Sequence, residues 1–119
     1  MNFREVLERV CSRVEGAVGA VIIAEDGIVV ERHSVETAVD LELASVEFVG
    51  ASREMRRATA AAQDGEMQEM IVVNDRRLSL LRLVGPGYYL LLLVSPSALL
   101  GRARYELRRA ALELASEFS

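Results

Sequence analysis

Seven consecutive apolar or aromatic residues, Tyr88–Val94, constrain the fold more than any other part of the sequence. A strand without a polar face has to be covered on both sides, as a central strand between layers of helices is. The run is much shorter than the roughly 20 apolar residues that a membrane-spanning helix needs. Turn-forming residues precede it at Pro86-Gly87 and follow it at Ser95-Pro96. We therefore expect Tyr88–Val94 to be the central strand of a sheet that has helices on both faces.

The rest of the chain alternates between helical and strand patterns. Helices are predicted from Phe3 to Gly16 with Asn2 as the cap, over residues 38–63 with Thr37 as the cap, and from Ser95-Pro96 onward. Strands are predicted at Ala17–Ala24, Ile28–Arg32, Glu66–Val73 and Arg77–Val84. The order is therefore α-β-β-α-β-β-β-α, and the fold class is α/β (α+β). In the last helix we expect two ion pairs, Arg102 with Glu106 and Arg109 with Glu113.

The long helix predicted over residues 38–63 has two faces of different character. A regular apolar stripe should face the sheet, and it consists of Leu41, Ala44, Phe48, Ala51, Met55, Ala58 and Ala62. The opposite face is apolar in its first half and carries arginines in its middle: Leu43, Val46, Gly50, Arg53, Glu54, Arg57 and Ala61. Single exposed apolar residues are normal on any surface. A contiguous strip of them on one helix indicates contact with another protein, and we favour that interpretation.

Composition restricts the classes of function. We predict a single domain over 1–119, because 119 residues can bury a core of their own. The net charge of -4 argues against binding to nucleic acid. Cys11 is the only cysteine, so no intrachain disulfide can form. His33 is the only histidine, and we expect it to lie in a solvated loop.

No residue pattern typical of catalysis, a metal site or a cofactor site is present, and the strands read as a filled core rather than a small-molecule site. The chain does not start with a leader-like apolar segment. We expect a cytoplasmic protein that is not an enzyme and has no membrane partner.

The sequence resembles the Roadblock/dynein light chain family over essentially its whole length. The matching segments are Val18–Ile23 before Asp26-Gly27, the alanine-containing long helix, Tyr88–Val94, and Leu100–Leu107 at the start of the last helix. Because the family is recognised by pattern and order, none of these segments is highly specific alone. The small bacterial, MglB-like members are the most similar.

The resemblance implies a five-stranded antiparallel sheet of order 2-1-5-4-3, with the long helix on one face and both terminal helices on the other. It also implies a homodimer in which the third strand, Glu66–Val73, pairs with its copy while the long helices lie side by side. The dimer-interface residues are then Met67, Glu69, Met70, Ile71 and Val73. An unpaired apolar edge strand is prone to aggregation, which is an independent reason to expect a partner there.

The resemblance also implies a function, since family members regulate or scaffold small Ras-like GTPases or act as adaptors in dynein motors. In bacterial members the paired long helices form the platform that meets the GTPase, and this platform maps onto the outer face that contains Leu43 and Val46. The leading hypothesis is a homodimer that binds a small Ras-like GTPase and modulates its hydrolysis or localisation. The alternative is a structural subunit without effect on nucleotide turnover. An arginine finger from Arg53 or Arg57 is a further option, although the resemblance favours rearrangement of the GTPase's own residues.

Overall fold

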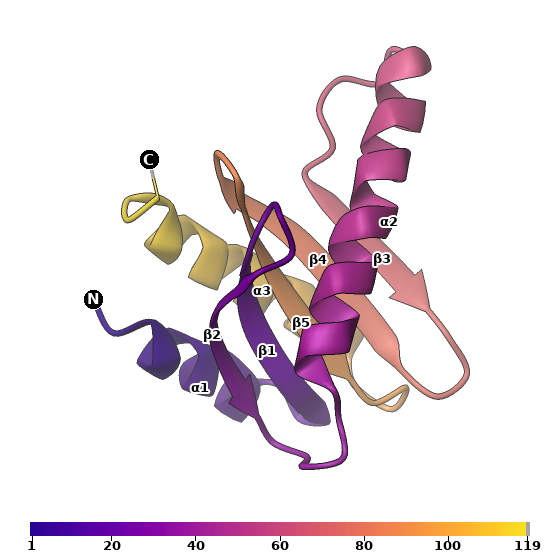
Figure 1. Ribbon diagram of the computed structural model, residues 1–119. Helices are drawn as coiled ribbons and strands as arrows, with labels where there is room; N and C mark the ends of the chain where they lie inside the picture. Colours follow the sequence, from indigo (N-terminus) through magenta and orange to yellow (C-terminus); the bar gives the residue numbers. More distant parts are fainter. Residues whose placement is uncertain (119) are drawn as a thin grey trace.

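The computed structural model describes residues 1–118 and shows an antiparallel sheet with helices on both faces (Figure 1). The elements are α1 (Phe3–Arg13), β1 (Ala17–Ala24), β2 (Val29–Ser34), α2 (Leu41–Ala61), β3 (Glu69–Val73), β4 (Leu78–Gly85), β5 (Tyr88–Val94) and α3 (Leu100–Ala115). The strand order is β2-β1-β5-β4-β3. Both the order and the central place of Tyr88–Val94 are as expected from the sequence.

Strand β5 contributes to two separate cores because its side chains alternate between the faces of the sheet. Leu90, Leu92 and Val94 belong to the core under α1 and α3. Tyr89, Leu91 and Leu93 belong to the core under α2. Side chains on both faces are completely shielded from solvent or nearly so. The absence of a polar face in β5 is thus explained by helices on either side.

Helices α1 and α3 cover one face of the sheet, and α2 crosses the other (Figure 1). Asn2 caps α1 as predicted, since its side chain accepts a hydrogen bond from the Glu5 backbone N–H. The two ends of the described chain meet, because the Phe118 ring stacks on Phe3 and on Tyr88, with ring centroids 5.3 and 4.1 Å apart.

Helix α2 differs from the sequence expectation at its start and in its buried face. It begins at Leu41, and its cap is Asp40, whose carboxylate accepts from the Leu43 N–H, in place of Thr37. The buried residues of the helix are Leu41, Ser45, Val49 and Ser52. Of the predicted stripe, Leu41, Ala44 and Phe48 contact the core under α2, whereas Ala51, Met55, Ala58 and Ala62 are exposed. The stripe was therefore predicted correctly only in its first half.

Two buried serines explain part of this difference. The Ser45 hydroxyl donates to the Leu41 carbonyl, and the Ser52 hydroxyl donates to the Val49 carbonyl. Both polar groups are thus satisfied within the helix, so these side chains can face an apolar core without loss of hydrogen bonds. The C-terminal half of α2 extends past the end of the sheet (Figure 1), which leaves its alanines uncovered.

Other element boundaries also shift. Ser95-Pro96 forms a turn in which the Ala98 N–H donates to the Ser95 carbonyl, and α3 starts only at Leu100, without a side-chain cap. Strand β3 starts at Glu69 rather than at residue 66. Strand β2 continues to Ser34, so His33 is half-buried within a strand and does not lie in a loop.

Candidate functional site

The outer face of α2 is the first candidate site. Leu43, Val46, Arg53, Glu54, Arg57 and Ala61 are exposed, and Gly50 is half-buried. Leu43 and Val46 show 59% and 57% of their surface to solvent, which is high for branched apolar side chains. A side chain at Gly50 would meet no heavy atom within 4 Å, so the middle of this face is flat. The face is thus accessible and apolar at its N-terminal end.

The β1–β2 hairpin borders this face, which the sequence alone did not indicate. Gly27 at the hairpin tip has a φ of +90°, and a Cβ there would lie 3.5 Å from the Val46 side chain. A glycine is favoured at this position because it accepts both the left-handed backbone and the close approach of α2. Ile28, next to it, is exposed. The apolar surface therefore continues from α2 onto the hairpin.

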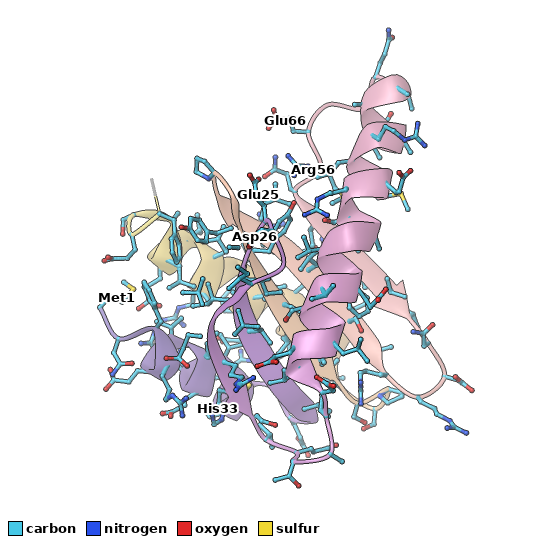
Figure 2. All side chains as sticks on the ribbon, in the orientation of Figure 1. Met1, Glu25, Asp26, His33, Arg56 and Glu66 are labelled. Carbon is cyan, nitrogen blue, oxygen red and sulfur yellow. The ribbon has the colours of Figure 1, made fainter. Side chains whose placement is uncertain are left out.

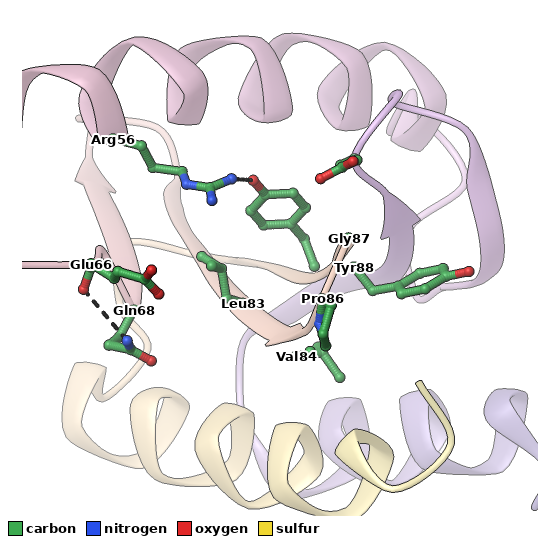
Figure 3. Close-up of a pocket in the computed structure, with 11 residues that line it drawn as sticks. Arg56, Glu66, Gln68, Leu83, Val84, Pro86, Gly87 and Tyr88 are labelled. Carbon is green, nitrogen blue, oxygen red and sulfur yellow. Dashed lines mark hydrogen bonds between the residues drawn. The ribbon is translucent and has the colours of Figure 1, made fainter. Parts of the chain in front are cut away.

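All three arginines of α2 make hydrogen bonds within the protein. Arg53 donates to the backbone carbonyl of Glu25 in the hairpin. Arg57 Nε donates to the Glu54 carboxylate over 3.1 Å. Arg56, which sequence reasoning missed, donates to the Tyr89 hydroxyl over 2.7 Å (Figure 3). Arg53 and Arg56 thus hold the overhanging half of the helix to the sheet through polar contacts.

A cleft lies beneath the overhanging half of α2 (Figures 2 and 3). It encloses about 400 Å³ between the β1–β2 hairpin, the β4–β5 turn and the segment before β3, and its polar lining includes Glu25, Arg56, Glu66 and Gln68. No group of three or more possible metal ligands occurs among residues 1–118. The charged groups in the cleft have opposite signs, which is an arrangement suited to polar contact with a protein surface.

The free edge of β3 is the second candidate site. Hydrogen bonds join Leu83 N–H to the Gln68 carbonyl and Asn74 N–H to the Arg77 carbonyl. Because bonding residues alternate along an antiparallel pair, the backbone groups of Glu69, Ile71 and Val73 point away from β4. Val73 is 66% exposed. Most of the predicted dimer-interface residues therefore present unpaired backbone groups at an apolar edge.

Met67, Met70 and the side chain of Glu69 do not lie open at this edge. Met70 is half-buried against the core under α2, and Met67 is half-buried before the strand begins. The Glu69 carboxylate accepts hydrogen bonds from Arg104 and Arg82, over 2.8 and 3.4 Å. Its side chain is thus occupied within the protomer, and only its backbone is available at the edge.

The opposite edge of the sheet, β2, is partly covered by its own charged side chains. The Glu31 carboxylate accepts from the Arg32 backbone N–H over 2.9 Å, and this bond is the main reason why the pKa of Glu31 is lowered. A register shift between Ile22 and Ile23 also interrupts the pairing with β1. Charged side chains and bulges are features that prevent edge-to-edge pairing. The β3 edge is therefore the more suitable of the two for pairing with another strand.

None of the helices described in residues 1–118 is long and apolar enough to cross a membrane. No protein-family sequence model matches the chain, and neither does any functionally curated protein. Solved structures do match it.

The structure of MglC from Myxococcus xanthus shares 34% sequence identity with this chain, with 98% of this chain and 99% of that chain covered and a TM-score of 0.70. A Roadblock/LC7 domain from Streptomyces avermitilis has 20% identity and a TM-score of 0.87, with 96% and 95% covered. The gliding protein MglB from Thermus thermophilus has 22% identity and the same TM-score, with 96% and 86% covered.

Proposed function

Because the chain belongs to the Roadblock/LC7 family as an MglB-like member, we propose that it is a homodimeric regulatory or adaptor domain for a small Ras-like GTPase. In this proposal it modulates GTP hydrolysis by its partner or the localisation of that partner. The observation that carries the proposal is the accessible apolar face of α2 around Leu43, Val46 and Gly50. The family resemblance supports this choice of face, because it implies that the paired long helices of bacterial members form the platform for the GTPase.

Two features support the homodimer. The first is the open apolar edge of β3, where Ile71 and Val73 have outward backbone groups. The second is the uncovered stripe Ala51, Met55, Ala58 and Ala62, in which the three small alanines allow close approach of another helix and Met55 adds exposed apolar surface. The family resemblance implies that pairing of two β3 strands brings two copies of α2 side by side, so one arrangement would cover both features.

The hydrogen bonds of the arginines argue for an indirect effect on hydrolysis. An arginine finger has to reach the phosphates of the partner's nucleotide. Arg53 is bonded to the Glu25 carbonyl and Arg57 to Glu54, so either would have to give up a hydrogen bond first. We therefore propose that the α2 face acts by changing the conformation of the GTPase, while Arg53 holds the hairpin in place.

The experiment is a capture assay with purified small GTPases from the same cell, each loaded with GDP or with a non-hydrolysable GTP analogue. We expect preferential capture of one GTPase in its GTP form, followed by a changed single-turnover hydrolysis rate. Equal capture of both nucleotide forms would instead favour the alternative function, a structural subunit without effect on turnover. Absence of capture for every GTPase tested would reject the GTPase proposal.

Gly50→Arg tests the role of the α2 face. The new side chain has room, and replacing a glycine inside a helix raises helix propensity by up to about 1 kcal/mol, so folding should be preserved. We expect loss of GTPase capture with a thermal midpoint that is not lowered. Gly101→Arg is the matched control, because Gly101 is also helical and open but lies in α3. Equal loss of capture in both variants would contradict the assignment of the α2 face.

A further inference from the structure

The outer face of α3 carries exposed apolar side chains that take no part in either core. Gly101, Tyr105, Arg108 and Leu112 follow one another at intervals of four, three and four residues, which puts them on one side of the helix. Tyr105 and Leu112 are 57% and 73% exposed. No heavy atom lies within 4 Å of a side chain built at Gly101, so the line begins in an open notch. We call these four residues the α3 outer face.

Positive charge on and beside this face is not neutralised within the protein. The expected pair of Arg109 with Glu113 does not form, because Glu113 accepts instead from Arg9 of α1 over 2.6 Å. The expected pair of Arg102 with Glu106 does form, at 3.3 Å. Arg108 and Arg109 have no ion pair or hydrogen bond within residues 1–118. Two guanidinium groups thus remain available next to Tyr105 and Leu112.

The acidic residues of α3 cannot balance this charge, since they already form ion pairs with other arginines. Glu106 is only 2% exposed, and both Arg13 and Arg102 approach its carboxylate, at 3.8 and 3.3 Å. The guanidinium of Arg102 also lies 5.9 Å from the centre of the Tyr105 ring, a cation–π distance that orients the ring. The face therefore combines an oriented aromatic ring, an exposed leucine and unpaired positive charge.

We propose that the α3 outer face binds an acidic amphipathic helix of a second protein partner. Leucine-type side chains of such a helix would contact Tyr105 and Leu112 and fill the notch at Gly101, while its carboxylates would pair with Arg108 and Arg109. A symmetric contact between the α3 outer faces of two copies is disfavoured, because it would bring the unpaired arginines of one copy close to those of the other. A broad anionic surface such as a membrane or nucleic acid is disfavoured, since the whole chain carries a net charge of -4.

The position of this face makes it independent of the proposed GTPase contact. Helix α3 lies on the face of the sheet opposite to α2 (Figure 1). Tyr105 and Leu112 also lie on a side of α3 different from that of Arg104, which bonds to Glu69 of β3. The domain could therefore hold an acidic helix and another protein at the same time, as an adaptor does.

The test uses a labelled synthetic helical peptide with leucines along one side and glutamates flanking them. A matched peptide with lysine in place of glutamate serves as the control. We expect the acidic peptide to bind the full chain and to shift the backbone NMR signals of Gly101, Tyr105, Arg108 and Leu112. Arg108→Glu should weaken binding by roughly tenfold or more in fluorescence anisotropy. Leu112→Ser should weaken it as well, and Gly50→Arg should have no effect.

Several results would overturn the proposal. These are no binding with the acidic peptide in large excess, equal binding of the lysine peptide, or signal shifts elsewhere in the chain. Sedimentation of the protein with phosphatidylserine vesicles, lost in Arg108→Glu, would assign the face to a membrane instead. Failure here is distinguishable from failure of the GTPase proposal, because GTPase capture responds to Gly50→Arg and not to Arg108→Glu.

Discussion

At the scale of single residues, Cys11 should make the free energy of unfolding depend on pH in the alkaline range. Its thiol lies on the buried side of α1, where desolvation raises its pKa from 9.0 to about 11. The unfolded chain releases this proton near pH 9 and the folded chain only near pH 11. The contribution of the thiol is therefore complete below pH 9 and is lost as the pH rises towards 11, by at most about 2–3 kcal/mol.

Cys11→Ala should remove this dependence. Chemical unfolding across the same pH interval should show the free energies of unfolding of the wild type and the variant converging as the pH rises. Other titrating groups cancel in that comparison, because both proteins contain them. A constant difference between the two proteins at all these pH values would show that the thiol is not desolvated.

Residues also determine how far the α2 face could be predicted from the sequence. Leu43 and Val46 were correctly placed at the surface, because the helical period alone separates them from Leu41. The buried residues Ser45, Val49 and Ser52 were missed, in part because a search for apolar spacing passes over serines. The predicted second half of the stripe is exposed because that part of α2 overhangs the sheet. Arg56 was missed for a related reason: its partner Tyr89 is far away in the sequence, and only the fold brings them together.

At the scale of elements, the attachment of α2 to the sheet changes along its length. The first half is held by apolar contacts of Leu41 and Val49, and the second half by the hydrogen bonds of Arg53 and Arg56. The central place of β5 could be predicted because burial on two faces requires it, whereas the order of the other strands was predicted only through the family resemblance. The start of α1 at Asn2 could be predicted too, but the start of α2 could not, because it depends on which of several polar side chains accepts the first N–H.

Tyr89→Phe tests how the second half of α2 is held. The variant keeps the buried ring and removes the acceptor for Arg56, at a cost of about 1 kcal/mol. We expect faster amide hydrogen exchange towards the C-terminal end of α2 and unchanged exchange in β1 and β5. Tyr88→Phe is the matched control, since the Tyr88 hydroxyl has no hydrogen bond within residues 1–118. Similar exchange in both variants would contradict a tether through Tyr89.

At the scale of the whole molecule, the two edges of the sheet have different properties. The β2 edge carries Glu31 and Arg32, and the Glu31 carboxylate occupies an outward N–H. The β3 edge carries Ile71 and Val73 with free backbone groups. In the homodimer proposed above, pairing would therefore use one edge only, and association would close after two copies instead of continuing into a fibre.

Val73→Pro should separate dimerisation from folding. Proline at this position removes an outward N–H and no bond to β4, and proline is tolerated where the N–H of an edge strand faces away from the sheet. For the wild type, we expect the thermal midpoint to rise with protein concentration, since a tenfold increase stabilises a folded dimer by about 1.4 kcal/mol. Val73→Pro should keep the circular dichroism of the fold, sediment as a monomer and lose this concentration dependence.

Val72→Pro should instead destabilise the monomer itself, because the Val72 N–H lies on the β4 side. A dimer that survives Val73→Pro would place the interface away from β3 and leave the exposed stripe of α2 as the surface to be tested next.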